Sequence, residues 1–342
     1  MTYVLPIKAA AANTSAEFAS YLSWLAQRAE TIVVDGSATD VFAEHATVWG
    51  AYVRHVAPHA DLATPMGKVG GVLTGVRLAS HERVIIADDD VRYDDASLAQ
   101  VARALDDHDV VRPQNYFEPL PWHARVDTGR MLLNRMTGGD WPGTLGVRRA
   151  VLRATDGYDG GVMFENLELV RTVCAAGGSE QVLLGAHVLR YPSSTRHFWS
   201  QRVRQAYDEM ARPARLVVQL AVLPVVVVLV LRGQWQLLAT GVAAIAAVAE
   251  IGRRRAGGTS VFPGSSSLLA PLWVAERAVC SWLALGAHVT LGGIPYRGTV
   301  LRQAATPMSV LEARHSGSYR RAPLQSNQSR LKPLHKARRQ SA

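Results

Sequence analysis

The stretch Val84-Ile85-Ile86-Ala87-Asp88-Asp89-Asp90 joins an apolar run to three consecutive aspartates. A continuous apolar run with β-branched residues is typical of a buried strand in a parallel sheet. In open α/β sheets, ligands bind just beyond the carboxyl ends of the strands. Neighbouring carboxylates repel one another unless a cation lies among them, and hard oxygen ligands suit Mg²⁺ or Mn²⁺ shared with substrate phosphates. The stretch therefore predicts a strand that ends at a metal and phosphate site, with a solvated acidic turn as the alternative.

Strand-like and helix-like segments alternate on both sides of this stretch. The strand-like segments are residues 3–7, 31–34, 84–87, 110–111 and 181–189, and the helix-like ones are 15–28, 67–78 (Gly-rich at its start), 96–105 and 165–176. Residues 48–56 fit either a short helix or a strand. The alternation predicts an α/β fold with a doubly wound, mostly parallel sheet.

The charge of the chain is concentrated at its C-terminal end. The formal net charge of the 342 residues is +9, and residues 296–342 hold ten Lys or Arg against one acid, so residues 1–295 balance to zero. A nucleic-acid-binding surface on the folded part is therefore not expected. The basic end is predicted to be a disordered tail beside anionic lipid headgroups. The two cysteines, Cys174 and Cys280, form neither a disulfide framework nor a metal motif.

Two long apolar segments follow the α/β region, at about residues 214–231 and 235–251. Each approaches the length of a membrane-spanning helix. Basic residues flank the pair at both outer ends, including Arg253-Arg254-Arg255 directly after the second segment. This pattern favours a transmembrane hairpin with the N-terminal domain in the cytoplasm, and a pair of buried helices in a soluble bundle is the alternative.

A third apolar segment, residues 268–294, carries Glu276-Arg277 near its centre. Because a charged pair inside a span is costly, we expect an interfacial or re-entrant helix on the cytoplasmic face rather than a third span. The chain is thus predicted to be a multi-pass protein of the plasma membrane. Its predicted parts are an α/β domain (1–210), a membrane region (211–295) and the basic tail (296–342).

Four short motifs within residues 1–210 resemble those of family-2 glycosyltransferases with the GT-A fold. The motifs are Val33-Val34-Asp35-Gly36-Ser37, Gly67-Lys68-Val69-Gly70-Gly71, Asp88-Asp89-Asp90 and Gln201-Arg202-Val203-Arg204-Gln205. The last is similar to the Gln-x-x-Arg-Trp motif of the membrane-bound members, with Gln205 in place of Trp. Together with the predicted hairpin, the motifs are similar to those of ceramide-type and hopanoid-type lipid glycosyltransferases.

The resemblance implies a role for the acidic and basic residues of the first three motifs. Asp35 would accept a hydrogen bond from the edge of a nucleotide base such as uracil, and Lys68 would neutralise a diphosphate. Asp88, which also belongs to the predicted donor site, and Asp90 would flank a divalent cation, Mn²⁺ or Mg²⁺. Asp89 would point away, because neighbouring side chains alternate in extended chain.

Transfer of a sugar to a hydroxyl also needs a base. In the matching segment Asn166 stands where the family has an aspartate, which leaves Glu165 as the first candidate base and Glu168 as the second. Either glutamate could instead be a helix N-terminal acid that complements the helix dipole. Arg204 would contact the diphosphate and Gln201 the acceptor, unless both belong to a solvated basic helix beside the membrane.

The predicted function is the metal-dependent transfer of a sugar from a nucleotide-sugar donor to a membrane lipid acceptor at the cytoplasmic face. The resemblance implies inversion at the anomeric carbon. One alternative is a transferase that acts on a polysaccharide or a polyprenyl phosphate. The other is a non-catalytic nucleotide-sugar-binding membrane partner that lost its base at Asn166, although the intact Asp88 and Asp90 favour an enzyme.

Overall fold

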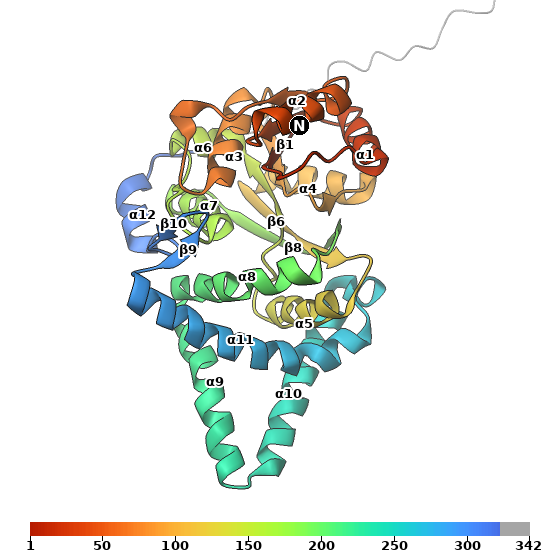
Figure 1. Ribbon diagram of the computed structural model, residues 1–342. Helices are drawn as coiled ribbons and strands as arrows, with labels where there is room; N and C mark the ends of the chain where they lie inside the picture. Colours follow the sequence, from red (N-terminus) through yellow and green to blue (C-terminus); the bar gives the residue numbers. More distant parts are fainter. Residues whose placement is uncertain (322–342) are drawn as a thin grey trace, which may run out of the picture.

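The computed structural model describes residues 1–321, and its centre is an eight-stranded sheet in the order β3-β2-β1-β4-β7-β6-β8-β5 (Figure 1). Strands β1 to β4, β6 and β8 run in one direction, and β5 and β7 run against their neighbours. The predicted α/β fold with a mostly parallel sheet is confirmed. The strands are β1 (Thr2–Ile7), β2 (Glu30–Asp35), β3 (Arg54–Val56), β4 (Arg83–Ala87), β5 (Val91–Arg92), β6 (Val110–Phe117), β7 (Thr144–Arg148) and β8 (Glu180–Arg190).

Helices cover both faces of this sheet. Val4 and Ile86 face α3, α6 and α7, whereas Leu5 and Ile85 face α1, α2 and α4. Because successive strand residues point to opposite faces, the apolar run of β4 contributes to both cores at once. The helices are α1 (Ala16–Ala26), α2 (Thr39–Trp49), α3 (Gly67–Leu78), α4 (Asp95–Asp107), α5 (Trp122–Met136), α6 (Arg149–Ala154), α7 (Glu165–Ala175), α8 (Thr195–Tyr207) and α12 (Met308–His315). The ambiguous residues 48–56 therefore contain both the end of α2 and the whole of β3.

The Gly-rich segment is the first turn of a helix, because α3 begins at Gly67. A Cβ atom at Gly71 would lie 2.9 Å from Cβ of Pro6, and one at Gly75 would lie 2.3 Å from Cγ1 of Val4. The missing side chains let α3 pack directly on β1. This close packing holds the start of α3 at the carboxyl edge of the sheet.

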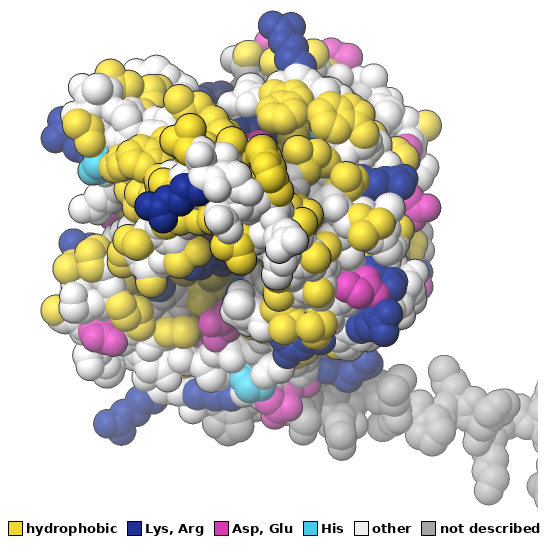
Figure 2. All heavy atoms as spheres, turned by 90° about the horizontal axis from the view of Figure 1, so that it is seen from below, with side chains coloured by type: hydrophobic (Ala, Val, Ile, Leu, Met, Phe, Trp, Pro, Cys, Tyr) yellow, Lys and Arg dark blue, Asp and Glu magenta, His cyan; other side chains and the backbone are white. Residues whose placement is uncertain are grey.

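Three helices are long and apolar enough to cross a membrane: α9 (Pro213–Leu231), α10 (Trp235–Arg254) and α11 (Gly264–Leu291). Helices α9 and α10 extend away from the α/β domain and are joined by a short turn, while α11 lies across their base (Figure 1). All of α9 is described, and none of its residues is buried. Seen from below, from the side of the turn between α9 and α10, hydrophobic side chains gather over much of the surface (Figure 2).

The charged pair at the centre of α11 faces the α/β domain. Glu276 accepts a 3.0 Å hydrogen bond from Nε of Arg202 on α8, and Arg277 is 2% exposed. Leu272 and Leu283 lie on the outward face and are half exposed. Helix α11 is therefore amphipathic, and the charges that make a simple span costly are turned toward protein.

The predicted disordered tail is wrong for residues 296–321. These residues contain the end of β9 (Ile294–Tyr296), all of β10 (Thr299–Leu301) and α12, which packs on α7. Leu311 and Tyr319 are buried, and the Tyr319 hydroxyl donates a 2.8 Å hydrogen bond to Asp109. A few apolar residues among the basic ones are enough to anchor the segment. The net charge of the segment gives no information about these residues. The rest of the predicted tail lies outside the described residues.

Candidate active site

A cavity of about 580 Å³ opens at the carboxyl edge of the sheet. Most of the predicted site residues line it: Lys68, Asp88, Asp90, Glu165, Gln201 and Arg204. Asp35 and Glu168 are not among its lining residues in the described part of the chain. The structure thus brings together residues from α3, the β4–β5 turn, α7 and α8.

The three aspartates form the turn between β4 and β5, and Lys68 reaches this turn from the start of α3. Nζ of Lys68 lies 2.6 Å from Oδ1 of Asp88 and 2.8 Å from Oε1 of Glu165. Burial alone would lower the pKa of Lys68, but the two carboxylates outweigh it and hold that pKa above its ordinary value. Lys68 is therefore a cation that joins the aspartate turn to the helix carrying the predicted base.

Arg190, which the sequence analysis missed, is the second cation of the site. Its Nε lies 2.9 Å from Oδ2 of Asp90, and its guanidinium also lies 3.2 Å from Oδ2 of Asp88. It is the last residue of β8, beside Val91 of β5. Ligands bind at the carboxyl ends of strands in such sheets, and this rule predicts a site role for Arg190 as well as for Asp88.

The aspartate turn has the properties of a divalent cation site. Burial would raise the pKa of Asp88, but Lys68 and Arg190 hold it below the ordinary value. Burial raises the pKa of Asp90, and the neighbouring Asp88 adds to this effect. Oδ1 of Asp90 is buried and has no hydrogen-bond partner within residues 1–321. A hard cation would satisfy this oxygen, so Asp88 and Asp90 fit Mn²⁺ or Mg²⁺. Asp89 is more exposed but still lines the cavity.

Gly143 allows Asp88 and Arg190 to meet. A Cβ atom at this position would lie 2.8 Å from Oδ2 of Asp88 and 2.9 Å from Cζ of Arg190. The Gly143 carbonyl accepts a 2.8 Å hydrogen bond from the Asp88 N–H. The side-chain amide of Asn166 donates to the carbonyl of Pro142, 3.1 Å away. Asn166 therefore supports the loop behind the aspartates.

The structure separates the two candidate bases. Glu165 lines the cavity, where Lys68 holds it. Glu168 is buried and its Oε2 accepts a 2.7 Å hydrogen bond from the backbone N–H of Thr306. Burial raises the pKa of Glu168 despite this bond. Glu168 therefore faces the segment that precedes α12 and not the cavity.

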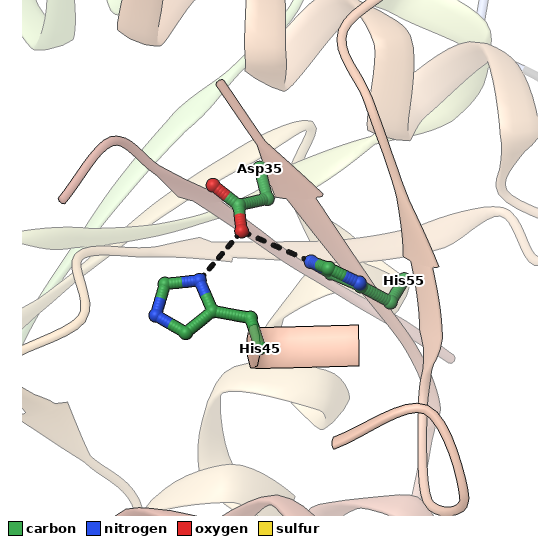
Figure 3. Close-up of side chains that lie close together, drawn as sticks. All are labelled: Asp35, His45 and His55. Carbon is green, nitrogen blue, oxygen red and sulfur yellow. Dashed lines mark hydrogen bonds and ion pairs between the residues drawn. The ribbon is translucent and has the colours of Figure 1, made fainter. Parts of the chain in front are cut away.

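Asp35 is buried and points toward His45 and His55 (Figure 3). Its buried Oδ2 accepts hydrogen bonds from Nδ1 of His45, 2.7 Å away, and from Nε2 of His55, 3.0 Å away. Its Oδ1 accepts a 2.9 Å bond from the N–H of Ser37. Since no surface of this side chain is exposed, it is not placed to contact a nucleotide base directly. Its neighbour Gly36 lines the cavity instead.

Asp35, His45 and His55 also offer three metal-ligand atoms within 4.8 Å of one another, a set that fits a divalent ion by residue type. Nε2 of His45 accepts a 2.9 Å hydrogen bond from the N–H of Asn13. Its Nδ1 must then carry the ring proton that Asp35 accepts. In this arrangement the three side chains form a closed hydrogen-bonded cluster, so the aspartate turn is the better cation site.

The remaining walls of the cavity come from α8 and the residues after it. The Arg204 guanidinium lies 5.1 Å from the ring centroid of Tyr296, on β9. Tyr296 and Arg297 line the cavity. They are not among the predicted site residues, because the sequence analysis assigns both to a disordered tail. Asp208 also lines it, and burial, reinforced by Glu165, raises the pKa of Asp208 well above its ordinary value.

No protein-family model and no curated protein sequence matches the chain. Among solved structures, it is similar to the mannosyltransferase PcManGT from Pyrobaculum calidifontis in complex with GDP-Man and Mn²⁺, at 16% identity over 82% of this chain and 86% of that chain, with a TM-score of 0.49. It is also similar to S. aureus TarS 1–349 (18% identity, 60% of this chain, TM-score 0.39), of which it matches 64%, less than two-thirds. A third likeness is to mannosyl-3-phosphoglycerate synthase from Rubrobacter xylanophilus (14% identity, 59% of this chain and 70% of that chain, TM-score 0.40). Likenesses this distant assign neither a family nor an activity.

Proposed function

We propose that the chain is a metal-dependent glycosyltransferase that moves a sugar from a nucleotide-sugar donor to a lipid acceptor at the cytoplasmic face of the plasma membrane. One observation carries this proposal. Lys68, Arg190, Asp88 and Asp90 meet in one cavity at the carboxyl edge of the sheet. The α/β domain that holds the cavity is joined to three apolar helices (Figure 1).

In this proposal, the side chains of Lys68 and Arg190 exchange their carboxylate partners for the diphosphate when the donor and a divalent metal ion bind. A cation held by Asp88 and Asp90 would supply positive charge against the departing diphosphate. The carboxylates would then no longer need Lys68 and Arg190, which would turn to the diphosphate oxygens. Arg204 lines the same cavity and adds a third positive charge. Such fixed charges stabilise the leaving group where its negative charge develops.

The nucleoside would lie between the ends of β1 and β2. Pro6, Gly36 and Pro58 line this part of the cavity. The Asp35 carboxylate lies directly behind Gly36 and ties it, through His55, to β3. Asp35 is therefore proposed as a positioning residue that fixes the wall of the nucleoside pocket.

The acceptor side of the proposal rests on the apolar helices. Helices α9 and α10 would cross the bilayer, and α11 would lie in its interface with the Leu272 and Leu283 face toward lipid. Arg212 and Arg215 begin α9, and Arg253 to Arg255 end α10, so the domain side of the helices is rich in positive charge. This distribution supports a cytoplasmic domain.

The test is metal-dependent release of nucleoside diphosphate by the full-length protein in detergent. A panel of UDP- and GDP-sugars would be offered with Mn²⁺ or Mg²⁺, with and without a membrane lipid extract. We expect release that the extract increases and that Asp90→Asn reduces at least 100-fold. Asp107→Asn, an exposed aspartate on α4, is the matched control and should behave as wild type. Binding of a nucleotide sugar without turnover under every condition would instead support the non-catalytic partner.

A further inference from the structure

A second cavity of about 210 Å³ adjoins the first on the side of the apolar helices. The two share Asp88, Glu165, Arg190 and Asp208 among their lining residues. The second cavity reaches α9 and α11 through the side chains Arg212, Arg215, Trp273 and Arg277. A group entering from the membrane surface would therefore arrive beside the aspartate turn through this space.

Positive charge exceeds negative charge at the membrane end of this second cavity. Arg212 and Arg215 share one carboxylate, Glu209, at distances of 2.7 and 3.5 Å. Arg277 has no carboxylate oxygen within 4.0 Å among the residues that the structure describes. Its guanidinium packs on the Trp273 ring, 5.2 Å from the centroid. A guanidinium buried beside a cavity with no carboxylate in direct contact is costly, and an anion in that space would offset the cost.

The polar atoms of the second cavity have unmet hydrogen-bonding capacity. In the described chain, Nε of Arg277, Nε of Arg212 and Oδ1 of Asp208 are buried without a hydrogen-bond partner. Two guanidinium donors match phosphate oxygens in geometry and charge. Burial, reinforced by Glu165, raises the pKa of Asp208, which favours the neutral form of this carboxyl group.

Each of the two predicted bases is engaged by another group of the chain. Glu165 is held by Lys68 at 2.8 Å, and Glu168 points away toward Thr306. An acceptor hydroxyl would need a base, whereas a phosphate monoester is already ionised near neutral pH. Transfer to a phosphate would therefore not need an aspartate base at position 166, because the nucleophile carries its own negative charge.

We propose that the acceptor is a membrane lipid that ends in a phosphate monoester, and that Arg277 and Arg212 hold this phosphate in the second cavity. This inference rests on the proposed glycosyltransferase function. One phosphate oxygen forms a bond to the anomeric carbon of the sugar. The bond from that carbon to the diphosphate oxygen breaks, and its electron pair leaves with the nucleoside diphosphate. No proton has to be transferred.

Three acceptor probes test the proposal with the full-length protein and its active donor: farnesyl phosphate, farnesol and inorganic phosphate. We expect a glycosylated lipid from farnesyl phosphate alone. Transfer to farnesol at an equal or higher rate, or to the lipid extract but not to farnesyl phosphate, would overturn the phosphate assignment and leave the proposed function standing. Equal use of inorganic phosphate would overturn the lipid source. Absence of donor turnover with every acceptor would instead reject the proposed function itself.

Variants separate the two roles within the site. Arg277→Gln should raise the KM for farnesyl phosphate at least tenfold, and Arg277→Lys should restore part of the affinity. Arg212→Gln is the second variant if Arg277→Gln does not fold, and Arg103→Gln, at an exposed position of α4, is the control. Glu165→Gln should lower kcat with farnesyl phosphate by less than the roughly 10²- to 10⁴-fold that loss of a general base costs. A loss of that size in folded Glu165→Gln would contradict the phosphate nucleophile.

Discussion

Glu168 accepts a hydrogen bond from the backbone N–H of Thr306 across a distance of 2.7 Å, so a residue of α7 holds the chain that leads into α12. We therefore expect Glu168→Ala to lower the free energy of unfolding by about 1–3 kcal/mol, because a buried N–H loses its acceptor. Glu168→Gln keeps an acceptor oxygen and should cost less than about 1 kcal/mol. Chemical denaturation measures both effects. A folded Glu168→Gln protein whose turnover falls more than 100-fold would contradict this structural role.

Gly143→Ala should reduce metal-dependent donor turnover at least tenfold. The new Cβ would meet Asp88 and Arg190 at less than 3 Å, and at least one of the two side chains must move. Gly264→Ala is a suitable control, since a Cβ there meets nothing within 4 Å. Steady-state kinetics at several Mn²⁺ concentrations would show whether the loss lies in the apparent metal affinity. Wild-type kinetics in Gly143→Ala would mean that the Asp88–Arg190 contact is unimportant.

Arg190→Gln should make the protein depend more strongly on divalent cations. The substitution leaves Asp88 and Asp90 without the guanidinium that now lies between them, so repulsion between the carboxylates increases. Added Mn²⁺ should therefore raise the Tm of Arg190→Gln more than that of the wild type. Thermal unfolding over a Mn²⁺ titration is the measurement. Equal shifts in both proteins would place the cation elsewhere.

The Asp35 cluster should stabilise the fold above acidic pH. Burial alone would raise the pKa of Asp35, but its hydrogen bonds from His55, Ser37 and His45 hold it well below the ordinary value. The stabilisation is therefore present above the unfolded-state pKa of about 3.9 and is lost as the pH falls through the lower folded-state pKa. Asp35→Asn should cost about 3–5 kcal/mol at neutral pH and lose this acid-dependent part.

Chemical denaturation of the wild type and of Asp35→Asn at pH 3 and pH 7 tests this prediction. A chelator should leave the free energy of unfolding of the wild type unchanged. A large loss of stability on chelation, rescued by Zn²⁺ in the wild type but not in Asp35→Asn, would show that Asp35, His45 and His55 hold an ion instead.

The parts of the site that could be predicted are those that a short stretch of sequence determines. The β4 run and its aspartates are adjacent in the chain, and Lys68 is followed in the same helix by Gly71 and Gly75, which let α3 pack closely on β1. Arg190 could not be placed as reliably, because its role depends on β8 ending beside a strand about a hundred residues earlier. His45 and His55 likewise reach Asp35 only after α2 and β3 have packed.

The two ends of the apolar region show the same limit. The sequence shows that Glu276 and Arg277 would be costly inside a membrane span. That this cost is avoided by contact with the α/β domain depends on Arg202 of α8, which is distant in the sequence. The net charge of the C-terminal segment predicts disorder, yet the fold of its described part depends on a few buried residues such as Leu311. Average composition does not reveal whether such residues meet a complementary surface.

Helix α8 has two faces with different neighbours. Gln201 and Arg204 face the cavity, while Arg202 lies between Asp127 of α5 and Glu276 of α11. Arg202 therefore connects α8 to α11, the helix that we propose lies at the lipid interface. If bilayer thickness changes the tilt of α11, Arg204 will shift relative to the aspartate turn. Turnover in nanodiscs of graded acyl length should therefore vary, and replacing Glu276 with Gln should flatten that dependence.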